Sequence, residues 1–374
     1  MAETALELPT FKGRPGWEFT DISALNLAAY RPVAAQDGAA DAEPLFELAQ
    51  PELPDGVLVT TLDQAPRDRL GSLIPEGDDV FVTLNDAGPR SGLLVYVPKG
   101  VVVEGPIPLT TVQSESGTLL NQRTLIVLEE GAQAEVWEQY LSPELDGVFN
   151  VVTELIVADN AHLRYVCGQA LSEKSWIFGA QRAQVGRDAS LDWVALGFGS
   201  TRGRVRMETR LAGQGADARV TGAYATHGRQ HIDFDTTQEH AAPNTTSDLA
   251  FRGVLQGRST AVWRGNIIVD PGAQKTDAFQ ESRNLLISKR AHADAIPGLE
   301  IQANDVRCTH AAAVAQVDPE QLFYLRSHGL GEKDAKRLVI EGFLAALVER
   351  FEEGPVREHL AEALERRLSL ILQN

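Results

Sequence analysis

The sequence predicts a mainly β protein whose core is a solenoid of stacked coils, with helical regions before and after it. Three observations support this fold class. Similar turns recur at intervals of 29, 28 and 27 residues, short β-branched runs fill residues 78–317 without a convincing helical period, and a helical pattern starts abruptly at Asp318. Repeats of roughly 20 to 50 residues without a helical signal are typical of solenoids and propellers.

The repeat is a tight turn that ends in alanine, with apolar residues two and four positions after that alanine. Its instances are Gly131-Ala132-x-Ala134-x-Val136, Asn160-Ala161-x-Leu163-x-Tyr165, Asp188-Ala189-x-Leu191-x-Trp193 and Gly215-Ala216-x-Ala218-x-Val220. We favour a β-helix-like solenoid, because a single coil cannot bury its own apolar face and has to stack on its neighbours. The Gly-His and Trp-Asp signatures of a propeller are missing, and a β-sandwich with irregular hairpins is the remaining alternative.

Residues 1–77 are predicted to form a partly helical N-terminal region. Asp21 is a candidate cap for a short turn, and residues 61–74 are expected to form one more helix. The motif Arg14…Trp17-Glu18-Phe19-Thr20-Asp21 suggests a docking segment with one anchoring aromatic side chain.

Residues 78–317 are predicted to form the β-helix core. Their β-type runs are short, rich in β-branched residues and bounded by Gly, Pro, Asp or Asn. Five such runs are residues 80–82, 93–97, 101–103, 124–128 and 151–157. We expect each of them to be a strand.

Residues 318–374 are predicted to form a C-terminal helical domain. Asp318 at the cap, Pro319 at the first helical position and Gln321 three residues after the cap predict a helix that Gly329 can end. A second helix is expected over 332–351 and a third after Gly354-Pro355. Their apolar faces are expected to be Ala335, Leu338, Val339, Phe343, Ala346 and Leu347 on the second helix, and Val356, Leu360, Leu364 and Leu368 on the third. These helices are too few to bury one another completely, so we expect the surplus to cover the end of the solenoid or a partner.

Composition narrows the function classes. The chain has 374 residues and a formal net charge of −18, which argues against a nucleic-acid-binding surface, because phosphate recognition needs clustered Lys and Arg. No run approaches the roughly 18 apolar residues of a membrane span, and the N-terminus lacks the basic and apolar parts of a signal peptide. We therefore expect a cytoplasmic protein that binds neither nucleic acid nor membrane.

The chain carries only two cysteines, Cys167 and Cys308. It therefore cannot supply a four-cysteine cluster or zinc site alone, and a disulfide framework is excluded, which fits a reducing compartment. The phosphate-binding pattern GxxxxGK[ST] and the nucleophile pattern GxSxG do not occur. If ATP drives the work of this protein, a partner must hydrolyse it.

Cys308 and His310 are the leading candidate site. A spacing of two places both side chains on the same face of a strand. A thiolate beside an imidazole is a plausible ligand pair for a metal or a cluster. The alternative is a small apolar cysteine and a hydrogen-bonded histidine in an ordinary β core.

A second polar group contains His227, His231, Asp233, Asp235 and His240. It suggests a cupin-like or non-haem iron site at first sight. In a strand, however, His231, Asp233 and Asp235 share one face, whereas His240 falls on the other. An intrinsic metal enzyme is therefore the less favoured interpretation.

Several strings of the sequence form an unusual combination. They are Ala273-Gln274, Thr276-Asp277-Ala278, Pro297-x-Leu299-Glu300-Ile301, Ala303-Asn304-Asp305-Val306, Cys308-x-His310, Leu322-Phe323-Tyr324-Leu325-x-Ser327-x-Gly329 and, in the β-helix core, His231-x-Asp233…His240-x-Ala242-Pro243. Together they resemble the SufB/SufD family of iron–sulfur cluster assembly proteins. The resemblance implies a right-handed parallel β-helix, in agreement with the repeat. It also implies a non-catalytic scaffold subunit, with mostly structural roles for His231, Asp233 and His240.

Within the family, the chain is more similar to the SufD branch. The Trp17–Asp21 motif resembles that branch, and the cysteine that a SufB would carry just before residues 284–287 is replaced by Glu281, Ser282 and Arg283. The histidine that SufD contributes matches His310. The sequence departs from the family at Ala311 and Ala315, where glycines are common.

The resemblance also implies partners. A SufB-like subunit would pair with the β-helix core, a homodimer being possible when the chain is alone. Iron or an iron–sulfur cluster would be bound transiently at that interface by His310 and Cys308, shared with the SufB-like subunit, and not held tightly by this chain alone. A SufC-like ATPase would dock on the C-terminal helices, and the residues carried over for that contact are Leu330, Ala335, Leu338, Val339 and Phe343.

Two other functions remain open. The first is a SufB-like homodimeric scaffold that uses a different scaffold residue. The second is a β-solenoid carbohydrate-active enzyme such as a lyase, which needs carboxylate and basic residues clustered along a groove. Enzymes of that kind are commonly exported, so the missing signal peptide counts against the second alternative.

Overall fold

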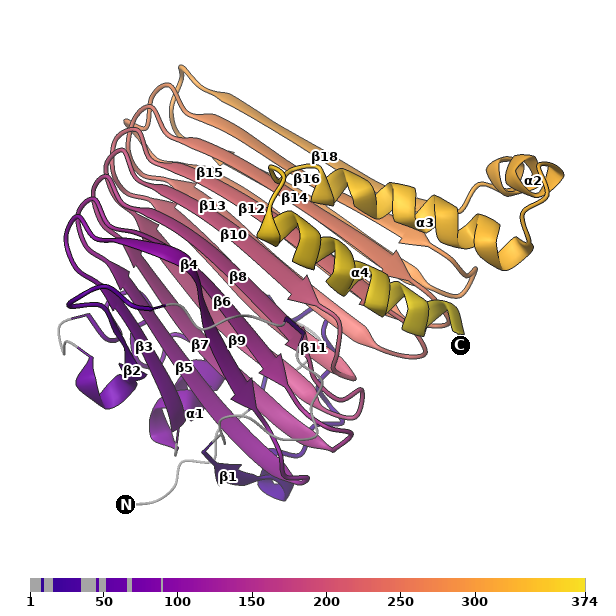
Figure 1. Ribbon diagram of the computed structural model, residues 1–374, viewed down its shortest axis with the longest axis horizontal. Helices are drawn as coiled ribbons and strands as arrows, with labels where there is room; N and C mark the ends of the chain where they lie inside the picture. Colours follow the sequence, from indigo (N-terminus) through magenta and orange to yellow (C-terminus); the bar gives the residue numbers. More distant parts are fainter. Residues whose placement is uncertain are drawn as a thin grey trace.

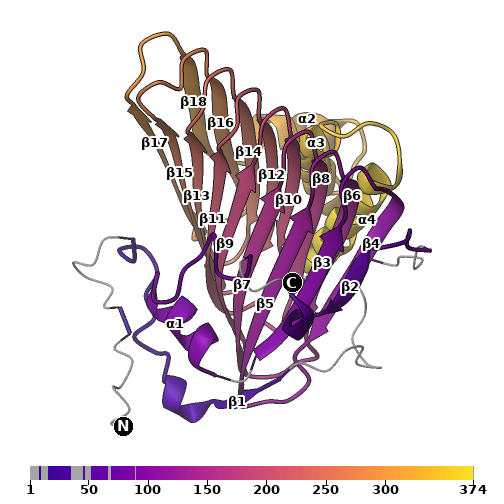
Figure 2. The same cartoon turned by 90° about the vertical axis from the view of Figure 1, so that its left-hand side faces the viewer.

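The computed structural model describes residues 8–9, 16–34, 45–46, 52–65, 69–88 and 90–373. Two parallel sheets face each other, and the chain alternates between them strand by strand (Figure 1, Figure 2). The odd-numbered strands from β3 onward form sheet A, and the even-numbered strands from β4 onward form sheet B. The parallel pairing confirms the predicted β-solenoid and excludes the sandwich of hairpins.

Sheet A contains, in spatial order, β3 (Arg90–Val97), β5 (Thr118–Leu128), β7 (Gly147–Val157), β9 (Trp176–Val185), β11 (Arg202–Leu211), β13 (His231–His240), β15 (Thr260–Val269) and β17 (His292–Ile301). Sheet B contains β4 (Val102–Val112), β6 (Gln133–Leu141), β8 (His162–Ala170), β10 (Ser190–Gly197), β12 (Asp217–Thr226), β14 (Thr246–Leu255), β16 (Asp277–Leu286) and β18 (Arg307–Gln316). At the N-terminal end of sheet A, β2 (Leu58–Thr61) pairs antiparallel with β3, and β1 (Arg31–Val33) pairs with β5. The predicted runs at 93–97, 101–103, 124–128 and 151–157 all fall within, or within one residue of, these strands.

The repeated turns are the corners that lead into sheet B. The residue before each repeat alanine has a positive φ, between +53° and +75°, and these residues are Gly131, Asn160, Asp188 and Gly215. Such a backbone is easiest for glycine and is tolerated by Asn and Asp. The backbone N–H of each corner donates to the next coil, as from Gly131 to Asp159 O at 2.9 Å. The alanines that follow are buried.

One continuous apolar core fills the space between the two sheets. A polar group interrupts it near the N-terminal coils, where Glu138 accepts hydrogen bonds from the hydroxyls of Thr124, at 2.6 Å, and Tyr165. Burial is the main cause that raises the pKa of Glu138. Burial also raises the pKa of the neighbouring Cys167 thiol to about 12. Burial therefore favours the neutral, protonated form of both side chains.

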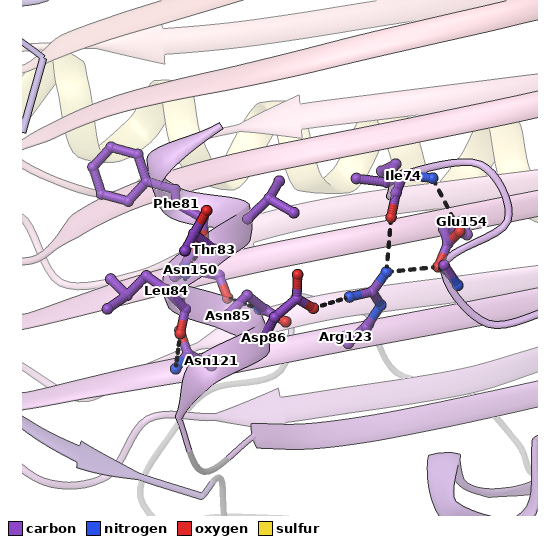
Figure 3. A network of polar contacts seen from close by, with 12 residues as sticks. Ile74, Phe81, Thr83, Leu84, Asn85, Asp86, Asn121, Arg123, Asn150 and Glu154 are labelled. Carbon is purple, nitrogen blue, oxygen red and sulfur yellow. Dashed lines mark hydrogen bonds and ion pairs between the residues drawn. The ribbon is translucent and has the colours of Figure 1, made fainter. Parts of the chain in front are cut away.

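Residues 80–82, predicted as a strand, instead begin helix α1 (Val80–Ala87). The Asp79 side chain caps this helix by accepting from the N–H groups of Phe81 and Val82 at 2.7 and 2.9 Å. Figure 3 shows α1 against sheet A, where Arg123 donates to Asp86 at 2.5 Å and to Glu154 at 3.0 Å. The cap and this docking outweigh the β propensity of the two valines.

The prediction of a helix over residues 61–74 is also wrong. In the described residues of this stretch, 61–65 and 69–74, the structure has a single 3₁₀ turn, η2 (Leu62–Gln64), similar to η1 (Leu27–Ala29) earlier in the chain. The N–H groups of Gly71, Leu73 and Ile74 donate to the Glu154 carboxylate at 2.9, 2.9 and 3.2 Å. A carboxylate on β7 therefore binds backbone donors that a helix would have paired internally.

The C-terminal region forms three helices, as predicted: α2 (Pro319–Ser327), α3 (Glu332–Val348) and α4 (Pro355–Gln373). The Asp318 side chain caps α2 by accepting from Glu320 N at 2.9 Å, and Gly329 follows its end with φ +95°. Of the two expected covers for the surplus apolar surface, the solenoid end is wrong, because α3 and α4 lie across the outer face of sheet B (Figure 1). A partner as the other cover stays a prediction. That face offers them an apolar surface that includes Trp137, Val166 and Val194.

The buried face of α3 is rotated from the predicted one. Ala335 and Leu347 are buried as expected, but Ile340 and Leu344 replace Leu338, which is 49 % exposed. On α4 the predicted row Val356, Leu360, Leu364 and Leu368 is buried. None of the helices described is long and apolar enough to cross a membrane.

The buried carboxyl of Glu138 generates a prediction about stability and pH. Its folded-state pKa is raised, so the folded protein binds more protons than the unfolded chain, and stability falls as pH rises above the unfolded-state pKa. Glu138→Gln keeps the shape and cannot ionise, so we expect it to stabilise the protein at pH 8 relative to wild type, with a smaller difference at pH 5. Urea unfolding at both pH values measures this. The exposed Glu352→Gln serves as the control, and a pH-independent difference for Glu138→Gln would contradict the prediction.

Candidate functional site

The solenoid ends at β17 and β18, and both are edge strands. In the described part of the chain, β18 pairs only with β16, and β17 only with β15. No residue of β18 is fully buried. Each of these strands therefore presents a row of backbone groups without a strand partner, and such an edge is a ready template for pairing with another chain.

Cys308 and His310 lie on the inward face of β18. In the ladder Cys308 is opposite Ala278 and His310 is opposite Gln280, and both of these β16 residues are buried between the sheets. The structure therefore brings the two predicted side chains onto one face of one strand. Cys308 packs partly against an apolar cluster with Val306, whereas His310 is exposed because no further coil covers it.

The open end is also apolar. Leu299 and Ile301 on β17 and Val314 on β18 occupy positions that are buried in earlier coils, yet Ile301 and Val314 are each 43 % exposed. A solenoid normally needs a cap over its last coil. This end lacks one among the described residues, and the histidine and the cysteine lie within its surface.

The opposite edge of sheet B is built differently. Strand β4 contains Pro106 and Pro108, and its register with β6 shifts between Val102 and Pro106. Proline has no N–H to donate, and irregular register prevents regular pairing, so both features protect an edge. Strand β18 has neither feature, whereas β17 contains Pro297, so β18 is the strand of the C-terminal end that is suited to pairing.

Cys308 and His310 can supply only part of the ligands that a metal ion or cluster needs. Burial raises the pKa of the Cys308 thiol, with Asp277 as a further cause, so a metal ion would have to displace its proton. Both cysteines are free thiols. The described residues contain no group of three or more His, Cys, Asp or Glu side chains that could hold a metal ion. Two donors are therefore what this end offers.

The second polar motif is structural. His231 and Asp233 face outward on sheet A, where the Thr20 hydroxyl donates to Asp233 at 2.6 Å and lies 3.3 Å from His231 Nε2. Burial lowers the pKa of His231 to about 4. His240 faces the other way, as predicted, toward Thr245 and Ser247, and burial lowers its pKa to about 4 as well.

The N-terminal motif and this histidine motif therefore form one contact. The centroid of the Trp17 ring lies 5.5 Å from the centroid of the Phe81 ring. The Arg204 guanidinium lies over the Trp17 ring, 4.9 Å from its centroid. Arg204 and Arg264 each approach the buried Asp233 carboxylate to 3.6 Å. The predicted docking role of the Trp17 segment is confirmed by this geometry, although Arg14 lies outside the described residues.

The five residues that the family resemblance implies for a partner contact on the C-terminal helices differ in their exposure to solvent. Leu338 is 49 % and Leu330 36 % exposed, Val339 and Phe343 are partly buried, and Ala335 is fully buried in the packing of α3. Ala335 can therefore support such a surface but cannot touch a partner.

The most exposed aromatic residues of the C-terminal region were not among the residues that the family resemblance implied for a partner contact. Phe323 and Tyr324 on α2 are 74 % and 62 % exposed, and no residue of α2 is buried. The sequence did contain a signal for this exposure. A short helix that packs by one narrow face cannot bury two adjacent aromatic residues. The exposed large apolar side chains on α2, on α3 and between them are Phe323, Tyr324, Leu330 and Leu338, and we call this set the α2–α3 patch.

Comparisons with known proteins agree with the sequence motifs. The family described as "SUF system FeS cluster assembly, SufBD core domain" matches residues 110–343. The chain is 34 % identical to the iron–sulfur cluster assembly protein SufD of Bacillus subtilis, over 77 % of this chain and 67 % of that protein. It is 31 % identical to an iron–sulfur cluster assembly SufBD family protein of Mycobacterium tuberculosis, over 75 % and 72 %, and 27 % identical to the chloroplastic protein ABCI7 of Arabidopsis thaliana, over 96 % and 82 %. The parallel solenoid, its motifs and these matches together show that the chain belongs to the SufBD family of the SUF iron–sulfur cluster assembly system.

Proposed function

We propose that this chain is a SufD-branch scaffold subunit that pairs with a SufB-like subunit through its open solenoid end. The observation that carries the proposal is that end itself, where β18 presents Cys308 and His310 on the inward face of a coil that no described residue covers. A SufB-like solenoid placed against it would cap the apolar surface and pair with the free strand edges. Donors from both chains would then meet at one place.

Iron or a nascent cluster is the cargo in this proposal. The exposed His310 supplies a neutral imidazole nitrogen, and Cys308 supplies a sulfur once the metal has displaced its proton. A complete coordination sphere needs about four donors, so the partner has to provide the rest. Binding would be transient, because each chain alone offers an incomplete set.

Two features support the SufD branch over a SufB. Residues 281–283 contain no cysteine, and Ser282 in that segment is buried between the sheets. The Trp17–Asp21 motif also holds the N-terminal segment on sheet A through Thr20 and Asp233. The named relative from Bacillus subtilis agrees with this branch.

A SufC-like ATPase is the partner we propose for the α2–α3 patch. Exposed aromatic side chains are common anchors of protein interfaces, and Phe323 and Tyr324 in this set are the two most exposed large apolar residues of the described chain. The chain carries no phosphate-binding loop, so in this proposal it is a non-catalytic subunit and the ATPase hydrolyses the nucleotide. The two free thiols fit a cytoplasmic location.

A SufB-like homodimeric scaffold is the second candidate. One observation favours it: the same open end could face its own copy across a two-fold axis, which would bring two copies of Cys308 and of His310 together. Four donors from two identical chains would also complete a coordination sphere. The oligomeric state of the chain expressed alone, and its metal content, distinguish this arrangement from the heterodimer.

The role of His310 is tested by His310→Ala in a complex co-expressed with the SufB-like and SufC-like proteins of the same source. We expect the three-protein complex to form with wild type and variant, while iron and sulfide bound under anaerobic conditions fall by about tenfold or more in the variant. Size-exclusion chromatography and iron and sulfide analysis measure the two properties. His292→Ala, an exposed histidine on β17, is the matched control. Unchanged iron and sulfide in His310→Ala would contradict the ligand role, and failure of wild type to form any complex would contradict the branch assignment.

The ATPase contact is tested by Phe323→Ala and Tyr324→Ala. Truncating an interface anchor typically costs about 1 to 2 kcal/mol or more, so we expect each variant to bind the SufC-like ATPase about tenfold more weakly. Isothermal titration calorimetry with the full chain measures the affinity. Leu370→Ala, a comparably exposed apolar residue on α4, should bind like wild type. Equal losses for all three variants would show that the patch is not the specific docking surface.

The accessibility of the two thiols is tested by alkylation of the folded chain. Cys167 is buried with a pKa near 12, whereas Cys308 is partly exposed at the open end. We expect iodoacetamide to modify one thiol per chain in wild type and in Cys167→Ser, and none in Cys308→Ser, as counted by mass spectrometry. Pairing with the SufB-like subunit should protect Cys308. Rapid modification of Cys167 would contradict the buried arrangement, and an unprotected Cys308 in the complex would contradict pairing at this end.

A further inference from the structure

Two residues of the N-terminal region lie on the outer face of sheet B. Of the described residues before β3, only Leu45 and Phe46 belong to the apolar cluster beneath α3 and α4. They are 8 % and 3 % exposed. Strand β1 before them and strand β2 after them both pair within sheet A. The pair is therefore an isolated contact of the described N-terminal region with the opposite sheet.

Polar groups at this place bind the backbone of the pair. The side-chain oxygen of Gln139 on β6 accepts from the N–H groups of Leu45 and Phe46 at 2.8 and 3.3 Å. Thr110 on β4 accepts from the amide nitrogen of Gln139 at 2.7 Å, which fixes the direction of that oxygen. On the other side, Arg366 of α4 donates to the Leu45 carbonyl oxygen at 2.7 Å. Side chains from sheet B and α4 thus satisfy backbone groups that burial would otherwise leave without water.

The two apolar side chains fit a surface shaped for them. Phe46 meets Trp137 of β6 edge to face, with ring centroids 4.9 Å apart. An added Cβ at Gly168 of β8 would lie 2.3 Å from Leu45 Cδ2 and 3.3 Å from Phe46 Cε2. Gly168 does not have a positive φ. Space for Leu45, and not the backbone conformation, is therefore what requires glycine at this position.

The residues that hold the pair belong to elements that are fixed without it. Trp137 and Gln139 lie on β6, which pairs with β4 and β8, and Gly168 lies on β8, which pairs with β6 and β10. Helix α4 is fastened to sheet B by the buried Arg367, which donates to Ala225 O of β12 at 3.0 Å. The surface is therefore formed before the pair binds to it, as ligand sites usually are.

We propose that this surface is a binding site for a short peptide with a large aliphatic residue followed by an aromatic one, and that the chain fills it with its own Leu45–Phe46. Hydrogen bonds to the backbone together with pockets for particular side chains are the usual means of peptide recognition. A separate peptide of the same chemistry can therefore replace the pair. The site is independent of the proposed function, because none of its residues lies at the open solenoid end or on α2.

The full chain carrying both Leu45→Ser and Phe46→Ser tests whether the site binds a ligand when its own is missing. We expect a fluorescein-labelled peptide with the sequence of residues 42–49 to bind this double variant saturably, as measured by fluorescence anisotropy. Wild type should bind the peptide about tenfold more weakly or worse, because its own pair competes at a high effective concentration. A peptide with serine at both positions should bind neither chain.

Gly168→Ala and Gln139→Ala, each added to the double variant, test the location of the site. Alanine at position 168 places a Cβ where Leu45 packs, and alanine at position 139 removes the acceptor of two N–H groups. We expect each change to weaken peptide binding by about tenfold or more. Gly342→Ala on α3 is the matched control, since an added Cβ there meets nothing within 4 Å. Equal binding by wild type and the double variant, or equal binding with and without Gly168→Ala, would overturn the proposal.

Circular dichroism and urea unfolding establish whether each variant is folded. A folded double variant that does not bind the peptide would also overturn the proposal. If the double variant does not fold alone, we expect the peptide to restore the folded chain when it is present during refolding. A chain that stays unfolded with the peptide present would count against the site as well.

Discussion

The structure depends on the in-register stacking of corners between coils. At each corner into sheet B a residue with positive φ turns the chain, and its N–H donates to the equivalent corner of the next coil, as from Asn160 to Arg187 O at 2.8 Å. The geometry repeats because every coil has to match its neighbours, both in backbone hydrogen bonds and in the apolar columns between the sheets. A coil without a neighbour on one side is consequently incomplete, and that is the state of β17 and β18.

The flanking segments occupy the two outer faces and leave the C-terminal end free. On sheet A, the Trp17–Thr20 segment binds through the buried Asp233, whose carboxyl group lies 3.6 Å from the guanidinium groups of Arg204 and Arg264. On sheet B, α3 and α4 cover an apolar surface that would otherwise be exposed. Each outer face thus has its own cover within the chain, whereas the last coil has none among the described residues. In the proposed function, a partner bound at that coil completes the fold.

The candidate site combines an incomplete coil with an incomplete ligand set. His310 is exposed and Cys308 partly buried on the same face of an edge strand, and two donors do not satisfy iron or a cluster. The same partner that completes the coil would complete the ligands, so assembly and metal binding become one event in the proposed function. The short connection from β18 to α2 places the candidate ATPase surface on the continuation of that strand.

Local patterns in the sequence determined much of the fold and of the candidate site. The recurring Gly131-Ala132 type turn predicted the solenoid, because each corner imposes the same conformational demand. The spacing of Cys308 and His310 predicted a shared face, and Asp318 predicted the start of α2. These features depend on residues only a few positions apart, so the chain records them without reference to its tertiary contacts.

Other features were decided only by tertiary structure. Val80 and Val82 favour a strand locally, yet they begin α1 because Asp79 caps it and sheet A binds it. Residues 69–74 stay irregular because Glu154, some 80 positions later, accepts their N–H groups. The division into an N-terminal region (1–77), a β-helix core (78–317) and a C-terminal helical domain (318–374) stays a prediction. One physical reason explains three further outcomes. They are the burial of Ile340 instead of Leu338, the position of α3 and α4 on sheet B, and the exposure of Phe323. Periodicity shows that a helix has an apolar face, but the surface that this face meets is set by residues distant in the sequence.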